Sequence, residues 1–139
     1  MMKHSMEYRV PYADTDQMGV VYYANYLEYF ERSRTEMLRS IGLPYSELEK
    51  MGFFLPVAEA YCKYHSSAHY DELLTFSSWV REAKGVRLVV VSEVRFGEKI
   101  LATGFVTLAC VNREQKLSRL PARLIEKCTA LTEPGEEQK

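Results

Sequence analysis

Tyr12–Arg34 reads YADTDQMGVVYYANYLEYFERSR, which places two acids and a glycine directly ahead of an aromatic run with helical spacing. Residues at three- and four-residue intervals continue this run as a stripe of Leu27, Phe30, Arg34, Met37, Leu38 and Ile41. Such spacing predicts an amphipathic helix from about Tyr22 to Ile41. Gly42 and Pro44 then predict its end, because glycine adopts the left-handed conformation and proline cannot continue a helix.

Patterns typical of β-strands flank this helix on both sides. The first strand, MEYRVPY at 6–12, is short because Pro11 lacks a backbone N–H. A short helix in PYSELEKMG precedes four strand-like stretches, FFLPVAEAYCKYHSSAHY, ELLTFSSWVREA, VRLVVVSEVRF and KILATGFVTLACVNRE, and LPARLIEKCTAL predicts a last short helix. This order predicts an α+β fold with the long helix packed on one face of a curved antiparallel sheet. One helix cannot cover so wide a sheet, and the sheet has open edges, so we expect an oligomer.

Composition and charge restrict the class of protein. The 139 residues are 47% hydrophobic, enough for one packed domain, which we expect at 1–131 with a disordered tail at 132–139. A net charge of −1, from 18 basic and 19 acidic residues, offers no attraction for nucleic acid or an anionic membrane surface. Cys62, Cys110 and Cys128 lack a CxxC spacing and are expected to be free thiols in a reducing cytosol. With no apolar run of membrane-spanning length, we expect a cytoplasmic protein.

The two acids before the helix have two interpretations. An acid at such a position is most often a cap or a turn former. Asp14 and Asp16, however, are followed by Gly19 and then by VVYY, where polar capping residues would be expected. A glycine lets a ligand approach the backbone, and unpaired N–H groups at a helix start can hold a developing oxyanion. A carboxylate beside such donors is the arrangement that ester or thioester hydrolysis needs.

The block DTDQMGVVYYANYLEYFERSR resembles the signature of the 4-hydroxybenzoyl-CoA thioesterase family, and within it the bacterial acyl-CoA thioesterase branch associated with the Tol-Pal genes. YDELLTF after HSSAHY matches a second, weaker family feature, and the resemblance covers about residues 6–128. It implies a hotdog fold, in which a curved antiparallel sheet wraps around one long central helix. It also implies hydrolysis of acyl-CoA to a free carboxylic acid and CoA, without metal or organic cofactor, by a homodimer or homotetramer whose site lies at the dimer interface.

The resemblance assigns roles to single residues. Asp16, the second acid of the D-x-D step, attacks the thioester carbonyl or activates the water that attacks. The backbone N–H of Tyr23 polarises the carbonyl oxygen, and Gly19 keeps the approach open. Asp14 is expected to form the turn that positions Asp16. Many members of the branch carry histidine where this chain has Tyr23, and a backbone contact survives that difference.

Substrate contacts are expected on both sides of the predicted reaction centre. Lys84 and Arg87 flank Gly85 at a turn between strands, which is either a solvated hairpin tip or, by resemblance, a site for the phosphates of coenzyme A. Asn25 either bonds the helix start or contacts substrate. The expected substrate-binding residues are Val20, Val21, Tyr22, Asn25, Lys63, Lys84 and Arg87.

Other reactive side chains have plainer expected roles. His65 and His69 are four apart on a predicted strand, roughly 13 Å at ~3.3 Å per residue, too far to share a metal ion. Cys110 lies in an apolar strand and is expected to be a buried thiol. Arg34 falls on the apolar stripe and is expected to extend to solvent or to pair with Glu31.

Two other functions remain open at this stage. A hotdog dehydratase needs a histidine near the helix, and residues 14–30 contain none. A non-catalytic acyl- or CoA-binding protein, or a scaffold, would use Asp16 only as a cap, and the sequence is compatible with that.

Overall fold

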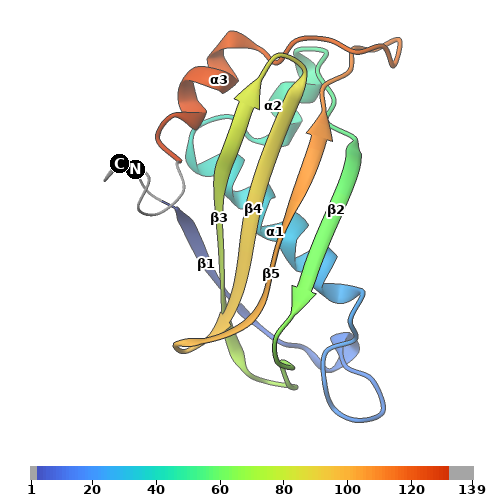
Figure 1. Cartoon of the computed structure of the whole chain (residues 1–139), viewed down its shortest axis with the longest axis vertical. Coiled ribbons are helices and arrows are strands. Elements are labelled where there is room, and N and C mark those ends of the chain that lie inside the picture. The colour runs from blue at the N-terminus through green and yellow to red at the C-terminus, as the bar shows by residue number, and fades with distance from the viewer. Residues whose placement is uncertain (1–2, 132–139) are drawn as a thin grey trace.

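Five strands form one antiparallel sheet in the order β1-β3-β4-β5-β2 (Figure 1). The structure is a computed structural model that describes residues 3–131, so the tail expected at 132–139 lies outside the described residues. The strands are β1 (His4–Arg9), β2 (Val57–Tyr64), β3 (Leu73–Lys84), β4 (Arg87–Phe96) and β5 (Lys99–Ala109). The predicted α+β class is confirmed, and the two sheet edges are β1 and β2.

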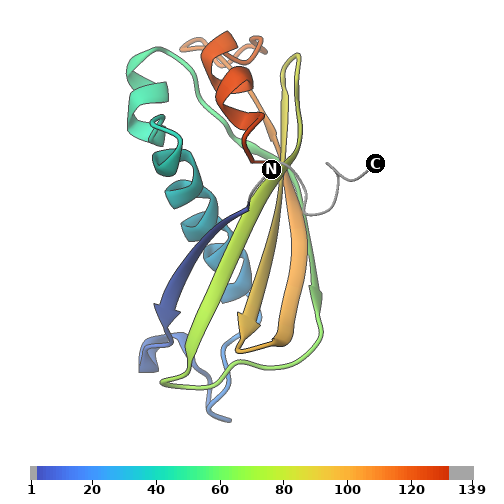
Figure 2. The ribbon, with the colours of Figure 1, turned by 90° about the vertical axis from the view of Figure 1, so that its left-hand side faces the viewer.

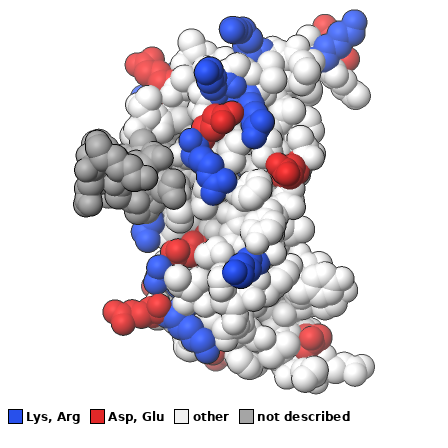
Figure 3. All heavy atoms as spheres, in the orientation of Figure 1, with Lys and Arg blue, Asp and Glu red and all other residues white. Residues whose placement is uncertain are grey.

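The helices lie on one side of the sheet. The helix α1 (Asn25–Ser40) runs across one face, while α2 (Tyr45–Lys50) and α3 (Ala122–Cys128) lie at the end near the β3–β4 turn (Figures 1 and 2). A short 3-10 helix, η1 (Tyr12–Asp14), joins β1 to the segment that enters α1. On the opposite face, basic and acidic side chains are scattered among uncharged surface (Figure 3). The described part of that face therefore carries charges of both signs.

The long helix begins later and is turned differently than predicted. It begins at Asn25, not at Tyr22, because the Tyr22 and Tyr23 carbonyls accept from the N–H groups three residues on, those of Asn25 and Tyr26, at 2.9 and 3.3 Å, and so form turns ahead of the helix. Leu27 and Arg34 do not face the sheet: Leu27 is 42% exposed, and both border a groove between α1 and β2. The buried face consists of Tyr26, Tyr29, Phe30, Ser33, Met37 and Leu38.

Small polar residues let α1 approach the centre of the sheet closely. Ser33 on the helix and Ser78 on β3 share a hydrogen bond of 2.6 Å, and Ser78 bonds Ser92 on β4 at 2.8 Å. Gly104 on β5 pairs with Ser92 and lies under Phe30. On either side of this row, apolar side chains form two core clusters, so the helix is fixed by a polar contact between two apolar regions.

Gly104→Ala is expected to destabilise the fold strongly. The added Cβ would contact the Tyr61 carbonyl oxygen and lie 2.7 Å from Cε2 of Phe30, so the β2–β5 pairing or the helix must shift. We expect a loss on the order of 3 kcal/mol in urea unfolding. Gly97→Ala is the control, because its Cβ would meet nothing within 4 Å and only the positive φ of 61° opposes it, at about 1 kcal/mol. Equal losses in the two variants would contradict the packing argument.

Candidate active site

A hollow of about 440 Å³ lies where the segment before α1 meets the end of β2. It is open to solvent and combines a carboxylate, an imidazole, hydroxyl groups and aromatic rings. Its lining consists of Asp16, Val20, Val21, Tyr22, Tyr23, Tyr26, Tyr64, His65, Ser66 and Ser67. Two chain segments far apart in sequence therefore build it.

Asp16 heads a tight turn that leaves one of its carboxylate oxygens unpaired. Its Oδ1 accepts hydrogen bonds from the backbone N–H groups of Met18 at 2.8 Å and Val20 at 3.4 Å. Its own N–H donates to the Val20 carbonyl at 2.9 Å. No donor within residues 3–131 reaches Oδ2, and the side chain is exposed at the hollow. The carboxylate is held through one oxygen and available through the other.

Gly19 explains how this turn closes. Its φ of 78° lies in the left-handed region, which favours glycine, and its N–H donates to the Asp16 carbonyl at 3.0 Å. The Gly19 carbonyl accepts from Tyr70 N–H at 3.3 Å, and Val20 forms an isolated bridge with His69. Gly19 itself does not line the hollow, so its observed part is to shape the turn and dock it against the segment after β2.

Asp14 is buried and does more than form a turn. Its Oδ2 accepts hydrogen bonds from the hydroxyls of Tyr8 on β1, at 2.8 Å, and Tyr29 on α1, at 2.7 Å. Its carbonyl oxygen accepts the Tyr22 N–H at 3.0 Å. One residue thus joins the first strand, the long helix and the segment between them.

Burial raises the pKa values of Tyr8 and Tyr29, the two tyrosines that donate to Asp14. Burial, with the hydrogen bond to Asp14 as a further cause, raises the pKa of Tyr8 to about 12. The same causes raise the pKa of Tyr29 further above its ordinary value. The guanidinium of Arg32 lies 5.1 Å from the Tyr8 ring centroid and bonds Glu28, so a cation covers the outer side of the cluster. Both hydroxyls therefore remain donors at neutral pH.

The unpaired backbone donors lie just before α1, not in its first turn. Asn25 and Tyr26 N–H groups already donate to the Tyr22 and Tyr23 carbonyls, at 2.9 and 3.3 Å. Within the described residues, the N–H of Tyr23 meets no acceptor. Because a trans peptide directs N–H opposite to C=O, and the Tyr22 carbonyl points at Asn25, the Tyr23 N–H points out of the turn.

The chain does not bring all the predicted contacts to this hollow. Val20, Val21 and Tyr22 line it, but Asn25 does not, since it starts α1. Lys63 neighbours Tyr64 in β2 and so faces the other side of the sheet. The last residue of β3 and the first of β4, Lys84 and Arg87, lie at the opposite end of the sheet (Figures 1 and 2).

Four of the lining residues not expected from sequence come from the end of β2 and the segment after it. They are Tyr64, His65, Ser66 and Ser67; the fifth, Tyr26, is on α1. His65 brings an imidazole to the hollow, where its Nε2 hydrogen-bonds Thr103 Oγ1 at 2.9 Å. Tyr26 accepts the Ala68 N–H at 3.0 Å, and burial raises its pKa. The adjacent HSS could have drawn attention as a polar step after a strand, but nothing local links it to Asp16.

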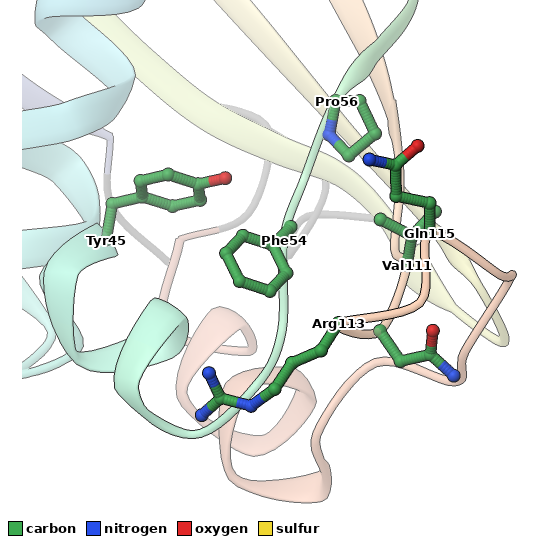
Figure 4. Close-up of a pocket in the computed structure, with 7 residues that line it drawn as sticks. Tyr45, Phe54, Pro56, Val111, Arg113 and Gln115 are labelled. Atoms are coloured by element: carbon green, nitrogen blue, oxygen red, sulfur yellow. The ribbon is translucent and has the colours of Figure 1, made fainter.

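A second hollow, of about 470 Å³, lies at the other end of the molecule (Figure 4). Figure 4 shows Tyr45 on α2, Phe54 and Pro56 ahead of β2, and Arg113 and Gln115 after β5. Its lining contains no carboxylate, imidazole or thiol, so it offers no group for hydrolysis.

Within residues 3–131, no three potential ligand side chains cluster as a metal site. No helix in that range is long and apolar enough to cross a membrane.

Comparison with known proteins identifies relatives of the whole domain. The model of the thioesterase-like superfamily matches residues 10–128. The acyl-CoA thioesterase YbgC of Haemophilus influenzae is 36% identical over 109 residues, which are 78% of this chain and 80% of that protein. The solved structure of a probable thioesterase from Bartonella henselae has a TM-score of 0.81 at 36% identity, covering 86% of this chain and 99% of that one. That of the DHNA-CoA thioesterase from Staphylococcus aureus has a TM-score of 0.85 at 28% identity, covering 94% and 90%.

Alkaline pH is expected to destabilise the fold through the tyrosines around Asp14. Both pKa values are raised in the folded state, so the contribution of both tyrosines is complete below pH 10; that of Tyr8 is lost as pH rises through about 12, and that of Tyr29, whose pKa is raised further, declines over the same range. The free energy of unfolding, measured in urea between pH 9 and 12, should therefore fall. Tyr29→Phe removes one such group and should make the fall shallower. Parallel curves for the two proteins would contradict this assignment.

Proposed function

Because the chain belongs to the thioesterase-like superfamily and is an acyl-CoA thioester hydrolase with the hotdog fold, we propose that Asp16 is its reacting carboxylate and the Tyr23 N–H its oxyanion donor. One observation carries the proposal: Asp16, with an unpaired Oδ2, and Tyr23, with an unpaired N–H, line the same hollow. A carboxylate and a backbone donor on opposite sides of a thioester carbonyl are what its hydrolysis requires.

Two courses of reaction use the same groups. In the first, Oδ2 of Asp16 attacks the carbonyl carbon, the carbon–sulfur bond breaks, CoA leaves as thiolate, and water hydrolyses the mixed anhydride. In the second, Asp16 removes a proton from water, whose oxygen attacks the carbonyl before CoA leaves. In both, negative charge develops on the carbonyl oxygen and is met by the Tyr23 N–H at the positive end of α1. Neither course needs a metal ion.

The walls of the hollow suit an acyl group beside the reacting carbonyl. Val20 and Val21 supply apolar surface, and the rings of Tyr22, Tyr23 and Tyr64 supply aromatic surface. The ring centroids of Tyr22 and Tyr23 are 4.8 Å apart, and Tyr23 meets Tyr64 edge to face at 6.3 Å. We propose that these rings flank the acyl chain.

A second copy of the chain is proposed to complete the site. β2 is a sheet edge with Val57 52% and Tyr61 50% exposed, and the groove it forms with α1 holds Leu27 and Arg34. Burial lowers the pKa of Arg34 and Glu31 opposes this, yet no ion pair of Arg34 occurs within residues 3–131. An exposed edge favours a pairing strand, and the unpaired Arg34 guanidinium would be covered favourably by a partner that sets an acid beside it.

Antiparallel pairing of two β2 strands about a two-fold axis has a consequence for CoA. β2 runs from the hollow at Pro56 to the hollow at Tyr64, so pairing would set the Pro56 end of one copy beside the Tyr64 end of the other. The β3–β4 turn lies at the Pro56 end (Figure 1). We propose that Lys84 and Arg87 of the second copy approach the CoA phosphates in this way, whereas within one chain they are remote.

The location of the protein, its branch of the family and its domain bounds are also proposed. We propose a cytoplasmic location from the free thiols Cys62, Cys110 and Cys128, which suit a reducing compartment. We propose membership of the Tol-Pal-associated branch from the DTDQMGVVYYANYLEYFERSR block, and a single domain over 1–131 with CoA as the leaving group.

Asp16→Asn is expected to lower kcat for acyl-CoA hydrolysis by about 100- to 10,000-fold, because it removes the reacting charge and keeps the turn. Release of free thiol from a panel of acyl-CoAs measures this. Asp71→Asn is the control: it makes the same chemical change at an exposed acid outside the hollow, at a φ of 70° that asparagine tolerates. Unchanged turnover in Asp16→Asn would refute the assignment.

Ala60→Lys is expected to convert a dimer into a monomer and to lower turnover by roughly 10-fold or more, because it adds a charge inside the groove beside Arg34. Light scattering during chromatography should give about twice the chain mass of 16.1 kDa for the wild type and the single mass for the variant. The matched control is Ala122→Lys on α3, also exposed. A monomeric and fully active wild type would refute the proposed pairing.

A further inference from the structure

The orientation of the oxyanion donor depends on two successive peptide units around Tyr23. The first carries the Tyr23 N–H, and its carbonyl, that of Tyr22, accepts the Asn25 N–H at 2.9 Å. The second carries the Tyr23 carbonyl, which accepts a hydrogen bond of 3.0 Å from the Tyr64 hydroxyl. Because both planes meet at the Cα of Tyr23, fixing the second plane limits how far the first can rotate.

The Tyr64 bond is the long-range restraint on this turn. The Asn25 bond is local, and the Tyr26 N–H reaches the Tyr23 carbonyl only at 3.3 Å. Upstream, Tyr22 N–H is tied to Asp14, which fixes where the turn begins. Tyr64 ties its other side to the sheet, as the last residue of β2, 41 positions away in sequence.

The Tyr64 side chain is itself well held. Its ring meets Tyr26 edge to face at a centroid distance of 5.3 Å and Tyr23 at 6.3 Å. Burial, with the neighbouring Cys62 thiol as a smaller cause, raises the pKa of Tyr64 to about 12, so its hydroxyl keeps its proton at neutral pH. Ring and hydroxyl therefore do separate things: the ring forms a wall of the hollow, and the hydroxyl holds a backbone carbonyl.

We propose that Tyr64 is a positioning residue for thioester hydrolysis, whose hydroxyl aligns the Tyr23 N–H with the developing oxyanion. This rests on the proposed function. A donor aligned before substrate arrives stabilises the transition state without reorganisation, so loosening it lowers kcat more than it weakens substrate binding.

Tyr64→Phe tests the proposal, because it removes the hydroxyl and keeps the ring. We expect kcat to fall about 10-fold, less than the 100-fold or more that follows loss of an oxyanion donor, with KM within about two-fold of the wild type. The matched control is Tyr70→Phe, outside the hollow and similarly exposed, at 53% against 46% for Tyr64; its ring meets that of Tyr12 edge to face. It should leave both constants unchanged.

A second readout separates positioning from general weakening of the fold. In nitrogen-15 NMR spectra without substrate, Tyr64→Phe should shift the Tyr23 and Ala24 amide signals and speed the hydrogen exchange of the Asn25 and Tyr26 amides, whose bonds form the turn, and Tyr70→Phe should not. The oligomeric mass and thermal midpoint should match the wild type in both variants.

The outcomes distinguish this proposal from the one it rests on. If Asp16→Asn abolishes turnover while Tyr64→Phe keeps full kcat, the catalytic assignment stands and the positioning role is refuted. If Asp16→Asn keeps full turnover, the proposed reaction centre fails, and the amide signals still decide whether Tyr64 holds the turn. A rise in KM with unchanged kcat in Tyr64→Phe would also overturn the proposal, because it would mean uniform binding.

Discussion

The buried carboxylate of Asp14 is the interaction on which the site depends. A charge in this apolar setting is tolerable only because two hydroxyls donate to the same oxygen, one from β1 and one from α1. The carboxylate thereby fixes the distance between the first strand and the long helix. Its backbone carbonyl, which accepts the Tyr22 N–H, fixes where the chain enters the helix. The next acid, Asp16, stands on a turn whose position is already determined.

Asp14 and Asp16 therefore differ in what they can bind, because one is buried and the other is exposed. Asp14 is buried, and its Oδ2 is bonded to two core hydroxyls, so its surroundings keep the carboxylate away from a substrate. Asp16 is exposed and bonded through one oxygen only. The reaction proposed for Asp16 needs the support of Asp14, because a reacting carboxylate held by a loose loop would not meet the carbonyl at the right distance.

Much of the fold was predictable because its signals are local. The period of the residues around Phe30 and Met37 gave a helix, and alternation gave the strands. Their neighbours in sequence also placed Asp16 and Gly19 in a turn ahead of the helix, where the structure has them, while the catalytic role of Asp16 stays a prediction. The helix start was missed because Tyr22 and Tyr23 form turns with three-residue hydrogen bonds, which the spacing of apolar residues does not distinguish from the first turn of a helix.

The rest of the site could not be read from sequence because it depends on long-range pairing. In the sequence, Tyr64 and His65 are ordinary residues at the end of a strand. Their position in the hollow follows only from the folded arrangement of β2 and the segment before α1. The remoteness of Lys84 and Arg87 likewise follows from strand lengths and sheet order, which fix the end of the molecule where a turn lies. The spacing of residues along the chain shows neither which segments meet in the fold nor at which end a turn lies.

The place of β2 in the sheet also sets when the hollow can form. Within residues 3–131, β2 pairs only with β5, the last strand to be synthesised, although β2 itself precedes β3. A nascent chain can form α1 early, but Tyr64 has no sheet to hold it until Lys99–Ala109 has emerged and folded back. The hollow is therefore a property of the finished chain: a ribosome-bound or truncated fragment that lacks β5 carries Asp16 but has no sheet to set Tyr64 opposite it.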